Sequence, residues 1–261
     1  MKLSISNIGW DKSRDEEVYE KMISSGFEGL EIAPKRVFNE NPYEDLNIVR
    51  KWHDDISLRF VIPSMQSIWY GRSESIFGDD EGREELIKYT KKAVVFARTI
   101  GCGNLVFGCP KNRNMPDGAS EQTAVDFFKE LGDFADENGT AIGIEANPPI
   151  YNTNFLNTTE SALEFIRRVS SPGIKLNLDV GTMIQNNEDV SVLEGSASLI
   201  NHVHVSEPYL KKIAPRGLHS KLFAFLKANG YERFVSIEMG KQDDLHELFE
   251  AMEYVAEAAA D

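Results

Sequence analysis

The chain has 261 residues, of which 41% are hydrophobic and 27% are charged, a composition typical of a globular domain. It carries 28 basic and 42 acidic residues, and the resulting net charge of −14 disfavours general binding to nucleic-acid backbones. The longest uninterrupted apolar runs, residues 93–97 and 222–226, are much shorter than the about 20 residues that a membrane-spanning helix needs. We therefore expect a protein without a membrane span.

The first residues and the two cysteines argue against a secreted protein and against a cysteine-based framework. Residues 1–7 contain no apolar stretch long enough for a signal peptide, which favours a cytoplasmic protein. Cys102 and Cys109 fit no metal-binding or redox spacing, so we expect neither a disulfide framework nor a zinc ribbon.

Short apolar runs alternate with longer amphipathic stretches along the chain. The apolar runs predict strands over residues 3–8, 29–33, 59–65, 104–108, 140–146, 174–179, 199–205 and 234–239. The amphipathic stretches predict helices over residues 16–25, 43–54, 81–100, 122–138, 158–169, 190–196, 219–229 and 244–259. Glycine follows several of these helices, as expected at a helix C-terminus.

The alternation predicts the fold class. Eight strand–helix units in 261 residues give about 33 residues per unit, which suits a (β/α)₈ TIM barrel of about 250 residues. No linker or low-complexity segment interrupts the series, so we expect one α/β domain over residues 1–261. An open doubly wound sheet is the alternative architecture.

The last four predicted strands share one phase, and this is the strongest functional pattern in the sequence. Bulky aliphatic residues occupy alternate positions in each strand, and alternate residues point to opposite faces. If the aliphatic residues face the helices, a set of polar side chains faces the barrel interior near its C-terminal mouth: Glu145, Asp179, His204 and Glu238. Barrel enzymes place their active sites at this end.

Three carboxylates and an imidazole at one point predict a metal site. A lone acidic residue at a strand end is more often a helix cap or a solvated loop residue. At about 4 Å and an effective dielectric constant of about 20, however, each like-charged pair costs on the order of 4 kcal/mol, which a cation or bound protons would relieve. Oxygen and imidazole donors without a thiolate suit Mn²⁺, Mg²⁺ or Co²⁺ better than a structural zinc ion. We expect a divalent metal ion, with Mn²⁺ favoured and Zn²⁺ as a further alternative.

The order Glu–Asp–His–Glu resembles the sugar phosphate isomerase/epimerase family of the xylose-isomerase-like TIM barrel superfamily. The segments that carry the resemblance are 144–147 (IEAN), 157–158 (NT), 178–181 (LDVG), 202–207 (HVHVSE) and 236–238 (SIE). The superfamily includes ketose 3-epimerases, hydroxypyruvate isomerase, inosose dehydratase and endonuclease IV. The resemblance implies that Glu145, Asp179, His204 and Glu238 are metal ligands. It also implies that Glu145 and Glu238 exchange a proton with a substrate carbon.

Two positions depart from the epimerase pattern. The epimerases usually have a histidine three positions after the aspartate and an arginine six positions after the ligand histidine. This chain has Thr182 and Leu210 there. Both family residues contact substrate oxygens, so the departures leave the metal site complete but question the standard ketohexose substrate.

Other candidates for substrate binding lie in the expected mouth loops. Lys111 and Arg113 follow the fourth predicted strand and either form a solvated turn or contact a phosphate or carboxylate of the substrate. Trp10 and Gln66 follow the first and third strands and are candidates for the wall of a sugar pocket, although an aromatic residue there is as often core. Glu207, three residues past His204, is the best candidate to support the site from behind the ligands.

These patterns predict a divalent-metal-dependent isomerase or epimerase of a small sugar, keto-sugar or sugar phosphate. The reaction would pass through an enediolate, with the glutamate pair Glu145 and Glu238 as acid and base. The alternatives are a metal-dependent dehydratase of a keto-polyol and a non-catalytic sugar-binding barrel. The five dispersed histidines and the negative charge disfavour DNA cleavage of the endonuclease IV type. We expect a carbohydrate partner, neither nucleic acid nor membrane, and a homodimer as a candidate assembly because such barrels often pair.

Overall fold

The computed structural model describes residues 1–39 and 41–260, and within them seven parallel strands form one sheet in the order β2-β1-β7-β6-β5-β4-β3. The strands are β1 (Lys2–Ser6), β2 (Gly29–Glu31), β3 (Leu105–Phe107), β4 (Ile142–Ile144), β5 (Ile174–Asp179), β6 (Ile200–Val205) and β7 (Phe234–Ile237). Each of the strands β1 to β6 is followed by a crossover that returns the chain to the same end of the sheet, as parallel pairing requires.

The segment predicted as the third strand, residues 59–65, joins the two edge strands without forming a regular strand. Val61 makes an isolated parallel bridge to β2, and Met65 bridges both the residue after β2 and the first residue of β3. Pro63 lies between them and has no N–H to donate, so the ladder is interrupted there. The bridges close the sheet, and the fold is the predicted (β/α)₈ TIM barrel rather than an open doubly wound sheet.

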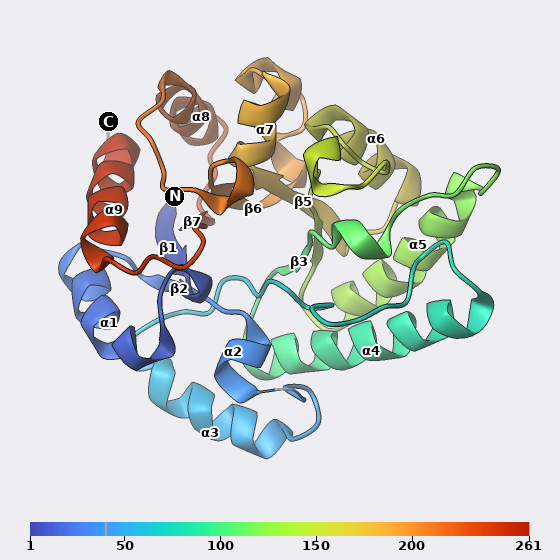
Figure 1. Ribbon diagram of the computed structural model, residues 1–261, viewed down its shortest axis with the longest axis horizontal. Helices are drawn as coiled ribbons and strands as arrows, with labels where there is room; N and C mark the ends of the chain where they lie inside the picture. The colour runs from blue at the N-terminus through green and yellow to red at the C-terminus, as the bar shows by residue number, and fades with distance from the viewer. Residues whose placement is uncertain (40, 261) are drawn as a thin grey trace.

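Helices form an outer ring around the strands (Figure 1). The α-helices are α1 (Asp15–Ser24), α2 (Pro34–Phe38), α3 (Leu46–Ile56), α4 (Asp80–Thr99), α5 (Glu121–Glu137), α6 (Thr159–Val169), α7 (Val180–Asn186), α8 (Gly217–Ala228) and α9 (Leu245–Ala260). Most of the predicted helices lie within about three residues of these bounds. Among the described residues, no helix has the length and apolar character to cross a membrane.

One predicted helix is wrong, and two observed helices, α2 and α7, are absent from the prediction. Residues 190–196 form only a 3₁₀ turn, Val190–Leu193, which ends before Gly195 at a φ of 69°. The regular helix after β5 is α7, which begins directly behind Asp179. The Asp179 side chain caps it by accepting a hydrogen bond from the backbone N–H of Thr182.

The apolar core lies between the strands and the helix ring, as the phase of the last four strands predicts. Phe128 of α5 shows the packing: its ring stacks edge-on against Phe107 of β3 and Phe165 of α6, with centroids 4.6 and 5.6 Å away. The barrel interior is different in character, because its inward-facing residues include polar side chains such as Asn177 and His202, each at most 1% exposed. The single domain agrees with the predicted fold class. Its predicted limits, residues 1 and 261, stay a prediction, and position 261 lies outside the described residues.

Candidate metal centre

The structure brings the four predicted ligands together at the C-terminal end of four neighbouring strands. Glu145 follows β4, Asp179 ends β5, His204 lies in β6 and Glu238 follows β7. One donor atom from each residue lies within 4.8 Å of the other three. Because β4 to β7 are consecutive in the sheet, their common phase places all four side chains on the inner face of the barrel.

Glu145 is held by two amides and has a glycine opposite it. Its Oε1 atom accepts a hydrogen bond from Nδ2 of Asn177 at 2.8 Å, and its Oε2 atom accepts one from Nδ2 of Asn147 at 3.3 Å. A Cβ atom at Gly108 would lie 2.1 Å from Oε2, far inside van der Waals contact. The absence of a side chain at this position therefore leaves the space that the carboxylate occupies.

Asp179 is both a helix cap and a member of the cluster. Its Oδ1 atom accepts from the backbone N–H of Thr182 and its Oδ2 atom accepts from Oγ of Ser206, both at 2.5 Å. Burial, together with the charge of Glu145, raises the pKa of Asp179 to about 6. The hydroxyl of Thr182, one of the two positions that depart from the expected pattern, donates to the carbonyl of Ala146.

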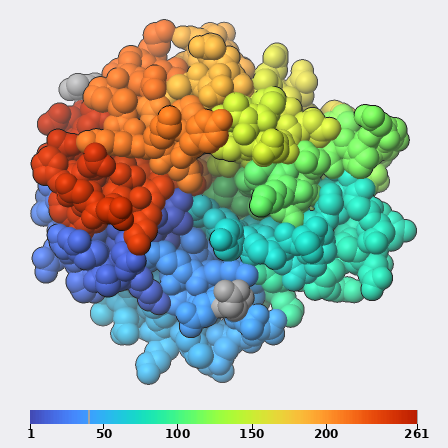
Figure 2. Space-filling view, viewed as in Figure 1, coloured from blue at the N-terminus to red at the C-terminus, as the bar shows by residue number. Residues whose placement is uncertain are grey.

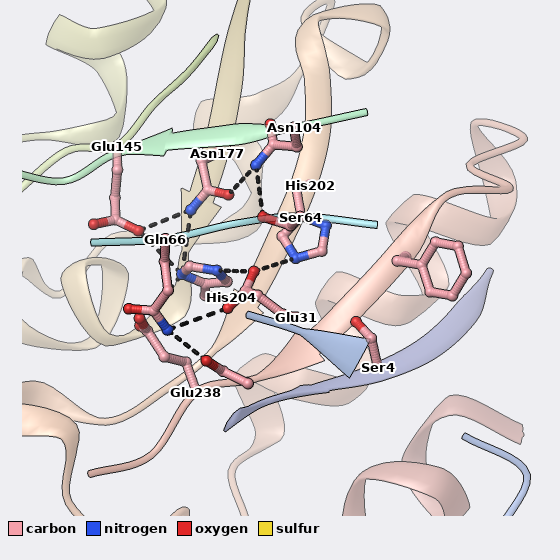
Figure 3. Close-up of polar contacts among 12 residues, drawn as sticks. Ser4, Glu31, Ser64, Gln66, Asn104, Glu145, Asn177, His202, His204 and Glu238 are labelled. Atoms are coloured by element: carbon pink, nitrogen blue, oxygen red, sulfur yellow. Dashed lines mark hydrogen bonds and ion pairs between the residues drawn. The ribbon is translucent and has the colours of Figure 1, made fainter. Parts of the chain in front are cut away.

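His204 lies between the cluster and a second buried carboxylate (Figure 3). Its Nε2 atom is 3.0 Å from Oε2 of Glu31, and its Nδ1 atom is 3.1 Å from Oε1 of Glu145 and 3.2 Å from Oε2 of Glu238. Burial opposes charge on the imidazole, but the carboxylates of Glu238 and Glu31 raise the pKa of His204 well above its usual value. Burial likewise opposes charge on Glu31, yet His204 and His202 hold its pKa well below its usual range.

The donor set fits a divalent cation. Burial, with the charges of Glu145 and Asp179, raises the pKa of Glu238 to about 7 against the opposing effect of His204. A cation at the centre would remove this mutual repulsion. Three carboxylates and one imidazole without a thiolate suit ions that prefer oxygen ligands. The residues that could hold it are Glu145, Asp179, His204 and Glu238.

A cavity of about 230 Å³ opens over the cluster. In the space-filling view the surface is hollowed near the middle of the face that carries the mouth loops (Figure 2). Glu145, Asp179 and Glu238 line the cavity, and so do Gln66 and Glu207, two of the residues predicted for substrate binding. All of the lining residues belong to the described part of the chain, and none of them is a lysine or an arginine.

Gln66 and Glu207 are fixed by neighbours behind the cavity wall. Nε2 of Gln66 donates to Oγ of Ser6 at 2.5 Å and to Oε1 of Glu31 at 3.3 Å. Both carboxylate oxygens of Glu207 accept from the guanidinium of Arg216, each at 2.6 Å. This ion pair anchors the loop between β6 and α8 to the mouth.

Three predicted substrate contacts are not among the residues that line this cavity. Trp10 is 2% exposed, and its indole N–H donates to Asp15. Lys111 lines a separate hollow beside the mouth. Arg113 has no exposed surface, and its guanidinium donates to the carbonyls of Glu145 and Leu156, at 2.8 and 3.4 Å. The expected anion contact of Arg113 is therefore corrected: the residue supports the backbone beneath the site.

Asn147, Ser206 and Tyr151 are among the site residues that sequence reasoning missed. Asn147 lines the cavity, and its place two residues after Glu145, in the same phase, was the available signal. Ser206 follows His204 by two residues in the same way and bonds Asp179. Tyr151 also lines the cavity, from a 3₁₀ turn in the loop after β4, where no periodic pattern identifies it.

The fold and the cluster together define a parallel (β/α)₈ barrel with a buried group of carboxylates and an imidazole at its C-terminal mouth. The family model described as "Xylose isomerase-like TIM barrel" matches residues 20–258, and the chain belongs to this family. A search of curated proteins gives no match.

Solved structures share the barrel at low sequence identity. D-psicose 3-epimerase from Clostridium cellulolyticum H10, solved with D-tagatose, is 14% identical with a TM-score of 0.82, covering 100% of this chain and 98% of its own. 3-Keto-D-glucoside 4-epimerase from E. coli is 18% identical with a TM-score of 0.78 and full coverage of both chains. The IolI protein, solved with a bound zinc atom, is 17% identical with a TM-score of 0.72, covering 100% of this chain and 95% of its own. At these identities the likeness establishes the fold.

Proposed function

We propose that this protein is a divalent-metal-dependent isomerase or epimerase of a small, uncharged keto-sugar. The observation that carries the proposal is the convergence of Glu145, Asp179, His204 and Glu238 beside a cavity of about 230 Å³. The reactions named for two of the structural neighbours, both sugar epimerisations, support it.

The charge of the cavity wall supports an uncharged substrate. Four of its lining residues are carboxylates, and the lining includes neither lysine nor arginine within the described chain. Of the two cations that follow β3, Arg113 is buried against backbone carbonyls and Lys111 faces a different hollow. A phosphate or carboxylate on the substrate would find no lysine or arginine among these lining residues, whereas hydroxyl groups find amides such as those of Gln66 and Asn147.

Each residue of the site has a definite task in such a reaction. A bound divalent cation would supply charge that polarises a substrate carbonyl and acidifies the neighbouring C–H bond. Glu145 and Glu238 would take and return the proton, since they reach the cavity from non-adjacent strands, β4 and β7. Asp179 and His204 would complete the ligand set, and Gln66 and Asn147 would orient the hydroxyl groups.

The test is a pair of ligand variants with matched controls. Asp179→Asn and His204→Ala should lose Mn²⁺ binding in calorimetry while the far-ultraviolet circular dichroism of the barrel persists. Asp54→Asn and His246→Ala, at exposed positions on α3 and α9, should bind as the wild type does. Unchanged metal content in both ligand variants would contradict the assignment.

The reaction class needs its own measurement. Incubation of the wild type with Mn²⁺ and a panel of ketoses, aldoses and their phosphates in D₂O should incorporate deuterium at one carbon of an uncharged keto-sugar. Loss of water from the substrate instead would identify a dehydratase, and binding without exchange would identify a sugar-binding barrel.

A further inference from the structure

Three asparagine side chains form a continuous hydrogen-bonded chain through the barrel interior beneath the candidate metal centre. It begins at Arg233, whose Nη1 atom donates to Oδ1 of Asn201. Nδ2 of Asn201 donates to Oδ1 of Asn104 at 2.8 Å, and Nδ2 of Asn104 donates to Oδ1 of Asn177 at 3.2 Å. Nδ2 of Asn177 then donates to Oε1 of Glu145 at 2.8 Å, and Figure 3 shows the steps from Asn104 to Glu145.

All three amides have the same polarity. Each carbonyl oxygen points toward Arg233 and each amide nitrogen points toward Glu145, so a cation stands at one end and a carboxylate at the other. Amide dipoles aligned head to tail polarise one another and strengthen the bonds between them. This uniform direction is what distinguishes the chain from polar groups that merely satisfy one another.

The chain spans the barrel from one face to the other. Arg233 and Asn201 lie where β7 and β6 begin, and both line a cavity of about 300 Å³ at the N-terminal face. Asn104 directly precedes β3, and Asn177 lies in the second half of β5. Glu145 stands beyond the C-terminal end of β4, so the chain connects the face opposite the mouth with the candidate site.

The barrel provides space for the central step. Gly143 lies on β4, between the strands that carry Asn104 and Asn177. A Cβ atom on Gly143 would lie 2.6 Å from Oδ1 of Asn104 and 2.9 Å from Cβ of Asn177, so any other residue there would push the two amides apart. Asn104 is 1% exposed and Asn177 has no exposed surface, in a region that TIM barrels usually fill with branched aliphatic residues.

We propose that Asn177, Asn104, Asn201 and Arg233 are positioning residues that together hold the Glu145 carboxylate in one orientation and stabilise its charge. Asn177 acts on Glu145 directly, and the other three act by fixing which way the Asn177 amide faces. The role of Glu145 in metal binding rests on the proposed function, whereas the asparagine chain itself does not.

The first test uses Asn104, which does not touch the cluster. Leucine has a similar shape but cannot donate to Oδ1 of Asn177, so Asn104→Leu should release the Asn177 amide. In the metal-free protein the side-chain amide resonances of Asn177 should shift, and the Kd for Mn²⁺ should rise by about 10- to 100-fold, as for other supports of metal ligands. Thr140→Val is the matched control, because it removes one buried hydroxyl that bonds Cys102 outside the chain of amides. It should leave both readouts unchanged.

The second test uses Arg233, at the exposed end of the hydrogen-bonded chain of asparagines. It does not require the core to tolerate a substitution. Arg233→Met removes the first donor and should shift the Asn177 amide resonances and raise the Kd for Mn²⁺ by a smaller factor. Arg233→Lys keeps a cationic donor and should restore both values toward those of the wild type. A purely structural role for Arg233 would not give an effect at Asn177 that lysine reverses.

The outcomes separate this proposal from the proposed function. Unchanged Asn177 resonances in Arg233→Met would overturn the proposed role of the asparagine chain, and so would an unchanged Kd for Mn²⁺ in a folded Asn104→Leu protein. If the wild type does not bind Mn²⁺, the proposed function fails. In that case the metal-free variants still test the asparagine chain. A shift of the Asn177 resonances would support its proposed role, and unchanged resonances would overturn it.

Discussion

Glu31 and His204 form a buried contact across the barrel, in which Nε2 of His204 lies 3.0 Å from Oε2 of Glu31. Glu31 belongs to β2 and His204 to β6, and neither side chain has exposed surface. A carboxylate that accepts the Nε2 proton leaves Nδ1 directed at Glu145 and Glu238, the side on which a metal would bind. Carboxylate–histidine–metal arrangements of this kind orient the imidazole and raise its basicity.

Glu31→Gln should weaken metal binding without removing a ligand. Glutamine keeps the size of the side chain but loses the charge that stabilises the His204 proton on Nε2. We expect the Kd for Mn²⁺ in calorimetry to rise by about 10- to 100-fold. Glu28→Gln, on the surface beside the same strand, is the control and should bind as the wild type does. Equal affinities in the two variants would show that Glu31 does not orient the ligand.

Gly108→Ala should damage the site while leaving the barrel folded. The added methyl group would meet Oε2 of Glu145 at 2.1 Å and displace the carboxylate. Since a misplacement of about 1 Å can cost about 100-fold in rate, we expect kcat to fall by about that factor. Gly103→Ala is the control, because the nearest atom to its Cβ, a backbone oxygen of Pro63, lies 4.0 Å away. Normal turnover in Gly108→Ala would mean that Glu145 works from a different position.

The sequence predicted the parts of the site that local periodicity determines. Asp179 and His204 lie within β5 and β6, and Glu145 and Glu238 directly follow β4 and β7. One alternating phase is therefore enough to place all four side chains on the inner face. The bridging segment around Pro63 has the apolar content of a strand, but Pro63 has no N–H to complete the ladder, so only isolated bridges form there. The helix α7 was missed although Asp179 followed by apolar residues is an N-cap signal.

Other features depend on contacts between distant segments, which periodicity cannot reveal. The Glu31–His204 pair joins residues 173 positions apart, and the contact between Asn201 and Asn104 joins residues 97 positions apart. Arg113 looks like a mouth-loop cation in the sequence, whereas the loop folds it inward to two carbonyls. Only the three-dimensional path of the loop decides whether the Arg113 side chain faces the mouth or the buried carbonyls.

Arg113 and Lys111 should therefore respond differently to substitution. Burial lowers the pKa of Arg113 to about 10, and its guanidinium bonds two carbonyls, so Arg113→Met should lose about 3 kcal/mol of unfolding free energy in urea. Lys111→Ala should change neither stability nor KM for an uncharged sugar. A rise of KM in Lys111→Ala that is confined to phosphorylated sugars would contradict the uncharged-substrate proposal.

The buried imidazole of His219 should make the folded protein less stable in mild acid. Burial lowers its pKa to about 4, and its Nδ1 atom contacts the hydroxyl of Tyr254 at 2.8 Å. The unfolded chain, with a histidine pKa near 6.5, binds a proton more readily than the folded protein, so stability falls as the pH drops from about 6.5 toward 4. The contribution is about 3 kcal/mol over that window.

His219→Gln should flatten this part of the stability profile. Urea denaturation at pH 7 and pH 4.5 measures the difference directly for both proteins. His246→Gln, at an exposed position, is the control and should keep the profile of the wild type. An equal loss of stability in wild type and His219→Gln would assign the acid sensitivity to other groups.

Glutamine substitutions at Glu145 and Glu238 should separate proton transfer from metal binding. Glutamine at either position keeps the size and one carbonyl oxygen but cannot accept a proton. Metal binding should weaken moderately, because Asp179, His204 and the other glutamate remain. Turnover should fall much further, since general base catalysis alone contributes about 10²- to 10⁴-fold.

The pattern of deuterium exchange then distinguishes the reaction types. If the two glutamates serve opposite faces of a planar intermediate, each single variant should still exchange deuterium into one epimer while failing to interconvert the pair. If one base serves an aldose–ketose isomerisation, one variant should be nearly inactive and the other merely slowed. Substantial turnover by the double glutamine variant at saturating Mn²⁺ would exclude both mechanisms, because neither carboxylate could then be the group that moves the proton.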